Sequence, residues 1–174
     1  MAARSKAKGS SFEREICRKL SLWITHGKSR DVFWRSAMSG GRATVARNRG
    51  EKIRQSGDIT AVAPEGHCLT DRFYIECRFY KDLALESFFL HRRGTLAKHW
   101  RQVVREANSH DKEPWLIAKQ NNRPILLVTA TRSVTLMYDP MAYTFTPASV
   151  YFGSAACQVW LLADVLKTKY QAME

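Results

Sequence analysis

An alternating run of eight residues, FYIECRFY at positions 73–80, is the feature that most constrains the fold of this chain. Successive side chains of a β-strand point to opposite faces of a sheet, so the run separates into two sets. One face is apolar and consists of Phe73, Ile75, Cys77 and Phe79. The other face consists of Tyr74, Glu76, Arg78 and Tyr80 and therefore carries a carboxylate beside a guanidinium.

Two interpretations of Glu76 and Arg78 are open from this stretch alone. An ion pair on a solvated sheet face is common and contributes little stability. Alternatively, the pair belongs to an active site together with Asp58, which lies 18 residues before Glu76 at the start of a second short apolar run.

The charge of the chain favours a nucleic-acid partner. Its 174 residues suit a single domain, and 28 Lys and Arg against 16 Asp and Glu give a net charge of +12. An anionic membrane surface is the competing explanation, but no apolar run approaches the roughly 18 residues of a spanning helix. We therefore expect nucleic acid as the partner and no membrane association.

The cysteines and histidines argue against a structural zinc site. The four cysteines include no CxxC pair, and the five histidines lack the spacing of zinc ligands. Three cysteines fall in apolar patterns, which is typical of reduced, buried thiols. The basic N-terminus lacks the apolar core of a signal peptide, so we expect a cytoplasmic location, in a bacterial or phage-infected host cell.

The order of expected elements predicts an α/β fold, with a central mixed β-sheet flanked by helices. A flexible basic tail at residues 1–10 is expected to precede a helix from Ser11 to His26, and a single domain is expected over residues 11–174. The core of this domain should span about residues 11–130. The extension at 131–174 is best interpreted as one strand followed by a second strand that runs into a short helix. The core strands and the second long helix are expected at 31–37, 58–63, 72–80, 94–109 (the helix), 114–119 and 124–130.

Glu13 is a carboxylate on the apolar stripe of the first helix. At about 100° per residue, Phe12, Ile16 and Leu20 gather within one arc, and Glu13 falls inside it. A carboxylate there is costly unless something pairs with it. It either stays partly solvated near the helix start, where the dipole favours it, or faces the same cleft as Asp58 and Glu76.

Converging carboxylates in a basic protein indicate metal-assisted phosphodiester chemistry. Mg²⁺ is held by carboxylates, waters and substrate phosphate, and the bound metal provides a hydroxide nucleophile near neutral pH. Arg78 would add a positive charge that stabilises the transition state.

The same residues carry a family resemblance. Gly57-Asp58 and Glu76-Cys77-Arg78 resemble the Pro-Asp and Glu-x-Lys elements of the PD-(D/E)XK nucleases. The upstream segments KGSSFEREICRKL and DVFWRSAMSGG resemble the opening of the archaeal Holliday junction resolvases, and the resemblance covers about residues 8–129.

The resemblance implies a restriction-endonuclease-like fold and a Mg²⁺-dependent endonuclease, with Mn²⁺ as a substitute. It implies that Glu13, Asp58 and Glu76 hold the metal, and that Arg35 and Ser39 contact the scissile phosphate or orient the site. Family members usually act as homodimers that cut two strands of a four-way junction, so DNA, in particular branched DNA, is the implied partner.

The chain departs from the family pattern in two places. Arg78 stands where the family has its catalytic lysine, and either Lys81 or, preferably, Lys119 could return an ammonium to the site. The segment 38–57 is also longer than usual. The alternative to a functional role is a solvated, disordered loop. If the segment is functional, its basic side chains would contact DNA, and these are Arg42, Arg47, Arg49, Lys52 and Arg54.

The leading hypothesis is therefore a metal-dependent DNA endonuclease that resolves branched DNA. A nicking, repair or restriction-type nuclease of the same superfamily acting on other DNA is the first alternative. The second is a DNA-binding protein that kept the nuclease fold without catalysis, because Arg78 replaces the lysine.

Overall fold

The computed structural model describes residues 2–36, 57–130, 147–153 and 155–168, with side chains from residue 7 onward. The chain is α/β, and its centre is a mixed five-stranded sheet with the order β3-β4-β5-β7-β6. β3 pairs with β4 in parallel, and the other three pairings are antiparallel. The strands are β3 (Phe73–Tyr80), β4 (Glu113–Gln120), β5 (Ile125–Ala130), β6 (Ala148–Phe152) and β7 (Ala155–Leu161). This architecture confirms the fold class predicted from the sequence.

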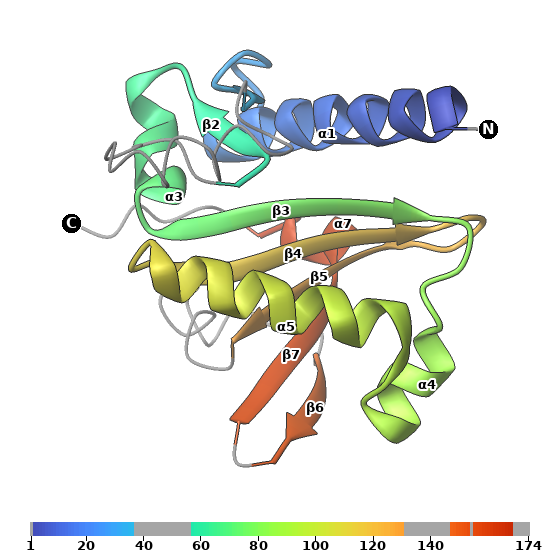
Figure 1. The fold of residues 1–174 in the computed structure, drawn as a ribbon. Helices are drawn as coiled ribbons and strands as arrows, with labels where there is room; N and C mark the ends of the chain where they lie inside the picture. The colour runs from blue at the N-terminus through green and yellow to red at the C-terminus, as the bar shows by residue number, and fades with distance from the viewer. Residues whose placement is uncertain (1, 37–56, 131–146, 154, 169–174) are drawn as a thin grey trace, which may run out of the picture.

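Two long helices cover opposite faces of the sheet (Figure 1). On one face, α1 (Ala2–Ile24) packs its apolar stripe against Phe73, Ile75 and Cys77 of β3. On the other face, α5 (Gly94–Ser109) packs against Tyr74 of β3 and Leu116 of β4. The alternation read from the sequence of residues 73–80 therefore sorts the side chains of β3 between two separate apolar cores.

The first helix begins earlier than predicted. It starts at Ala2 rather than at Ser11. Residues 2–10, where a tail was predicted, are therefore helical. The alanines and lysines of this segment have high helix propensity, which outweighs the single Gly9. At the other end the helix stops at Ile24, and Gly27 follows with a φ of +86°.

Short elements connect the layers. β1 (Phe33–Arg35) and β2 (Ile59–Ala61) form a separate antiparallel pair next to α1. The remaining helices are the 3₁₀ turn η1 (Pro64–Gly66), α3 (His67–Thr70), α4 (Leu85–His91) and α7 (Leu162–Val165). No pattern in the sequence predicted α4, which packs beside α5 through Phe88.

The C-terminal strands complete the main sheet. β7 lies between β5 and β6, and its Cys157 and Val159 enter the core under α5. Trp160, Leu162 and Val165 enter the core under α1. The predicted strand running into a short helix is thus confirmed as β7 and α7, whereas the other strand expected in this part, at 134–139, lies outside the described residues.

The buried hydroxyl of Ser21 fixes β1 against α1. It donates to the carbonyl of Cys17 at 2.8 Å and accepts from the backbone N–H groups of Val32 and Phe33 at 3.1 and 3.0 Å. Because β1 carries Arg35, this contact sets where Arg35 lies relative to the helix.

Cys17, Cys77 and Cys157 are buried, Cys68 is exposed, and all four are free thiols. In the segments that the structure describes, no helix combines the length and apolar character needed to cross a bilayer.

Candidate active site

Asp58 lies at the free edge of β3. Its backbone N–H donates to the carbonyl of Ile75 at 2.8 Å, and its Oδ2 accepts from the backbone N–H of Cys77 at 2.9 Å. Its own carbonyl accepts from the N–H of Ser36 at 2.9 Å. These bonds hold the buried carboxyl of Asp58, which is 6% exposed, against the strand that carries Glu76.

Gly57 makes this approach to the strand possible. It forms a parallel bridge with Ile75 and has a φ of +84°, in the left-handed region that other residues rarely adopt. A Cβ at this position would lie 2.5 Å from the carbonyl oxygen of Ile75. The glycine that replaces the usual proline of the motif is therefore a steric requirement of this chain.

Glu76 and Arg78 lie on the same face of β3, as the alternation predicted. The guanidinium of Arg78 pairs with Glu76 through Nη2 and lies 3.3 Å from Oδ2 of Asp58 through Nη1. Nη1 also donates to the carbonyl of Cys77 at 2.9 Å. Arg78 thus links the two carboxylates around the edge of the strand.

Glu13 approaches from α1 and is paired with Arg35 of β1. Nε of Arg35 lies 2.5 Å from Oε2 of Glu13, whose side chain is 13% exposed. The carboxylate on the apolar stripe of this helix therefore has an ionic partner in Arg35. With all five groups ionised, the three carboxylates and two guanidiniums of this cluster have a formal net charge of −1.

The electrostatics of the cluster favour additional positive charge. Burial raises the pKa of Asp58, and the nearby charge of Glu13 raises it further, against the opposing effects of the Cys77 N–H and Arg78. Burial also raises the pKa of Glu76, as do the charges of Asp58 and Glu106, again against Arg78. The single guanidinium of Arg78 does not fully compensate two buried carboxylates.

Among the described residues, no group of three or more His, Cys, Asp or Glu side chains is arranged to hold a metal ion. In this arrangement each carboxylate contacts an arginine, because Glu13 pairs with Arg35 while Asp58 and Glu76 share Arg78.

The comparison with protein families identifies the chain. The model of the family described as "Phage putative PDDEXK endonuclease" matches residues 4–153, which is most of the chain. The protein belongs to this phage endonuclease family. The PD-(D/E)XK resemblance is thereby confirmed, and the likeness to junction resolvases within it stays a prediction. No curated protein and no solved structure matches the chain.

The structure does not bring the two candidate lysines to Glu13, Asp58 or Glu76. Lys119 is in register with Phe79, on the α1 face of the sheet, whereas Glu76 and Arg78 face the other side. Its ammonium lies 3.8 Å from Glu15 and 5.2 Å from the ring of Phe79. Lys81 follows the end of β3 and is exposed. The preference for Lys119 overlooked the two-residue period of the strand.

Of the predicted DNA contacts, the structure describes Arg35 at the site. The other predicted contacts lie outside the described residues: Ser39, Arg42, Arg47, Arg49, Lys52 and Arg54.

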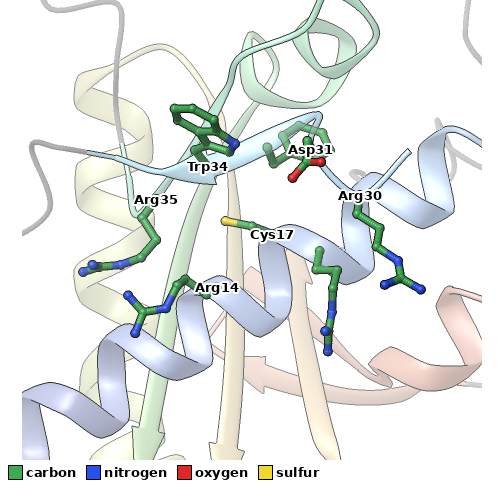
Figure 2. A pocket seen from close by; sticks show the side chains of 8 residues that line it. Arg14, Cys17, Arg30, Asp31, Trp34 and Arg35 are labelled. Atoms are coloured by element: carbon green, nitrogen blue, oxygen red, sulfur yellow. The ribbon is translucent and has the colours of Figure 1, made fainter. Parts of the chain in front are cut away.

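Sequence reasoning missed a pocket beside Arg35. The pocket has a volume of about 550 Å³ between α1 and β1, and Figure 2 shows its arginines around Cys17 and Trp34. The alternation of the segment DVFWRSA indicates an exposed Trp34, because its neighbour Phe33 is buried and successive side chains of a strand face opposite sides. The four-residue spacing of Arg14 and Arg18 likewise indicated a shared helix face.

Proposed function

We propose that this family member is a divalent-metal-dependent DNA endonuclease whose cation is held by Asp58, Glu76 and Glu13. The observation that carries the proposal is the pairing of Asp58 with the backbone of β3, beside Glu76. Backbone hydrogen bonds fix the carboxylate at the strand edge, as a site that must orient ligands requires.

The donor set fits a hard cation. All candidate ligands are carboxylate oxygens, which Mg²⁺ and Mn²⁺ accept. The pKa values of Asp58 and Glu76 are raised, and a cation bound between them would favour their ionised forms. When bound, such a cation supplies a water of lowered pKa and neutralises charge on the phosphodiester.

The arginines of the cluster account for the remaining chemistry in this proposal. Arg78 stabilises the negative charge that develops on the phosphate, as the family's lysine does. Arg35 contacts the scissile phosphate or orients the site, the latter through its ion pair with Glu13. In this structure Arg35 neutralises Glu13, and Arg78 is shared by Asp58 and Glu76.

We further propose that the substrate is branched DNA, cut as a four-way junction by a homodimer. The motifs around Glu13 and Arg35 support this specificity, because they resemble the opening of the junction resolvases. Nicking, repair or restriction-type cleavage of other DNA is the alternative within the nuclease class.

Incision mapping on a labelled four-way junction and a linear duplex of the same sequence tests the specificity. Each DNA is incubated with Mg²⁺, Mn²⁺ or EDTA, and the incised strands are sized. Symmetric incisions confined to the junction support the resolvase proposal. Equal cleavage of the linear duplex would contradict it and favour the alternative nuclease.

A non-catalytic DNA-binding protein is a second candidate, and the contacts of Arg78 favour it. One guanidinium contacts both Asp58 and Glu76, where a metal would have to bind. Tight DNA binding without incision in either metal would establish this candidate.

A further inference from the structure

The pocket beside Arg35 combines an aromatic surface with unusual positive charge. It is lined by α1, by the segment that leads into β1 and by β1 itself, and Figure 2 shows Arg14 and Arg35 on one side of Cys17 and Arg30 on the other. Its basic residues are Arg14, Arg18, Arg30 and Arg35, and Asp31 is its one carboxylate. Its volume of about 550 Å³ lies within the range of pockets that hold small ligands.

Trp34 differs from the other tryptophans of the chain. It is 60% exposed, whereas the other four are between 1% and 6% exposed and lie in the two cores. An indole on a paired strand is a rigid platform, and its neighbour in sequence, Arg35, pairs with Glu13 of the active site. An exposed aromatic ring held in this way can stack against the face of a nucleic-acid base.

The charge of the pocket is available to a ligand. Arg14, Arg18 and Arg30 are exposed, and within the described residues none of the ion pairs uses them. Arg14 and Arg18 are one helical turn apart on α1, so their guanidiniums can reach the same anion or successive anions. Guanidiniums match phosphate oxygens in geometry as well as in charge.

The thiol at the base of the pocket is not a nucleophile. Cys17 is buried, and its burial together with the charge of Glu13 raises the pKa of the thiol to about 12. The thiol is therefore neutral at physiological pH, and it contributes an apolar floor. Because its thiol is buried and neutral, Cys17 indicates a pocket that binds a ligand rather than one that reacts with it.

We propose that this pocket binds an unpaired nucleotide next to the scissile phosphate, with the base stacked on Trp34 and the phosphates on Arg14, Arg18 and Arg30. Inside a duplex both faces of each base are covered by its neighbours, so only an unstacked base can offer a free face to the indole. Asp31 is positioned on the same wall to accept hydrogen bonds from base amino groups. The substrate class is therefore DNA with a single-stranded or unpaired nucleotide at the cut site, and this specificity rests on the proposed nuclease function.

Binding without metal tests the proposal separately from cleavage. The probes are a fluorescein-labelled short oligothymidylate and a labelled blunt duplex, titrated in EDTA and followed by anisotropy. For the wild type, quenching of tryptophan fluorescence by the oligothymidylate is the expected accompanying signal, because Trp34 is the exposed indole.

Trp34→Leu should weaken oligothymidylate binding about tenfold or more, and Trp34→Phe should restore most of the affinity. Duplex affinity should change less than about twofold, because its bases stay stacked. Tyr151→Leu is the matched control, since Tyr151 is also 60% exposed but lies on β6. Unchanged oligothymidylate affinity in Trp34→Leu, or an equal loss for both DNAs, would overturn the proposal.

The double variant Arg14→Ala/Arg18→Ala tests the phosphate contacts. It becomes the deciding variant if the Trp34→Leu protein does not fold. The slope of log affinity against log salt for the oligothymidylate should fall by about 0.7 per lost contact. Arg105→Ala, on the opposite helix α5, is the charge control. Incision in Mg²⁺ by a Trp34→Leu protein with unaltered DNA binding would reject the pocket while leaving the nuclease function intact. Oligothymidylate binding that depends on Trp34, with no incision in Mg²⁺, would reject the nuclease function and leave the pocket proposal intact.

Discussion

Arg78 contacts both buried carboxylates of the site, so its charge competes with that of a bound cation. A lysine would present a compact ammonium to one carboxylate, whereas the guanidinium reaches Glu76 and Asp58 together. This geometry explains how the chain tolerates two buried carboxylates side by side at one strand edge.

Arg78→Ala should lower the single-turnover incision rate by about 10²–10³-fold, because a positioned charge on the developing anion is lost. Arg78→Lys should stay within about tenfold of the wild type, since the family's usual ammonium is restored. Single-turnover rates over a Mg²⁺ titration measure both effects. A wild-type rate in Arg78→Ala would show that Arg78 has no part in the chemistry.

The raised pKa of Glu76 makes the stability of the metal-free protein depend on pH. A carboxyl whose pKa is higher in the folded state binds more protons there, so its stabilising contribution is complete below the unfolded pKa, about 4.3. That contribution is lost as the pH rises through the folded value, which burial and the charges of Asp58 and Glu106 raise.

Glu76→Gln should therefore stabilise the metal-free protein at alkaline pH relative to the wild type, by about 1–2 kcal/mol more at about pH 9 than at about pH 5. Urea unfolding in EDTA at both pH values measures the difference between the two proteins. Taking the difference removes the opposite contribution of His99, whose pKa is lowered by burial and by the charge of Arg78. A constant difference across the pH range would contradict the raised pKa of Glu76.

Among the elements, the edge of β3 positions the site through one close backbone approach. Gly57 bridges to Ile75 and is followed by Asp58, whose carboxyl is bonded to Cys77. The position of the Asp58 carboxylate, the proposed metal ligand, thus depends on a residue with no side chain.

Gly57→Ala should destabilise the fold by about 1–3 kcal/mol more than Gly27→Ala. The two glycines have nearly equal φ values of +84° and +86°, but a Cβ at Gly57 meets backbone at 2.5 Å and a Cβ at Gly27 meets nothing within 4 Å. The comparison therefore isolates the steric contact with β3. Equal losses of unfolding free energy in the two variants would show that the contact is unimportant.

Sequence patterns predicted the elements in which apolar residues recur with a regular strand or helix period. The alternation of residues 73–80 identified both faces of β3, and the helical stripe identified Glu13 as a carboxylate in need of a partner. The partner itself, Arg35, and the sharing of Arg78 by two carboxylates depend on long-range packing that no local pattern encodes. The Ser21 bonds that hold β1 against α1 are equally hidden in the sequence.

Short elements and register accounted for the errors. Lys119 was placed correctly on the strand that neighbours β3, but the parallel register puts it opposite Phe79 rather than Arg78. The seven-residue helix α4 is flanked by two residues in the left-handed conformation, Ala84 and Arg92, which sequence patterns rarely reveal. The outward position of Trp34 was available from alternation and was not used.

For the whole molecule, the two faces of the sheet divide the tasks. The α1 face, with β1 and β2 beside it, carries the basic pocket and Glu13, whereas the α5 face carries Glu76 and Arg78. Asp58 lies at the strand edge between them, so DNA approaching that edge meets both sets. The net charge of +12 draws DNA to the protein, and the edge of β3 is where the proposed chemistry occurs.

The measurement that tests this account most directly is single-turnover incision of a labelled four-way junction by the wild type and by Asp58→Asn/Glu76→Gln. Asp71→Asn, which alters an exposed carboxylate outside the cluster, is the control. The account predicts incision in Mg²⁺ by the wild type and the control, no incision in EDTA, and a rate at least about 10²-fold lower in the double variant. Incision by the double variant at the wild-type rate would contradict the assignment of the active site.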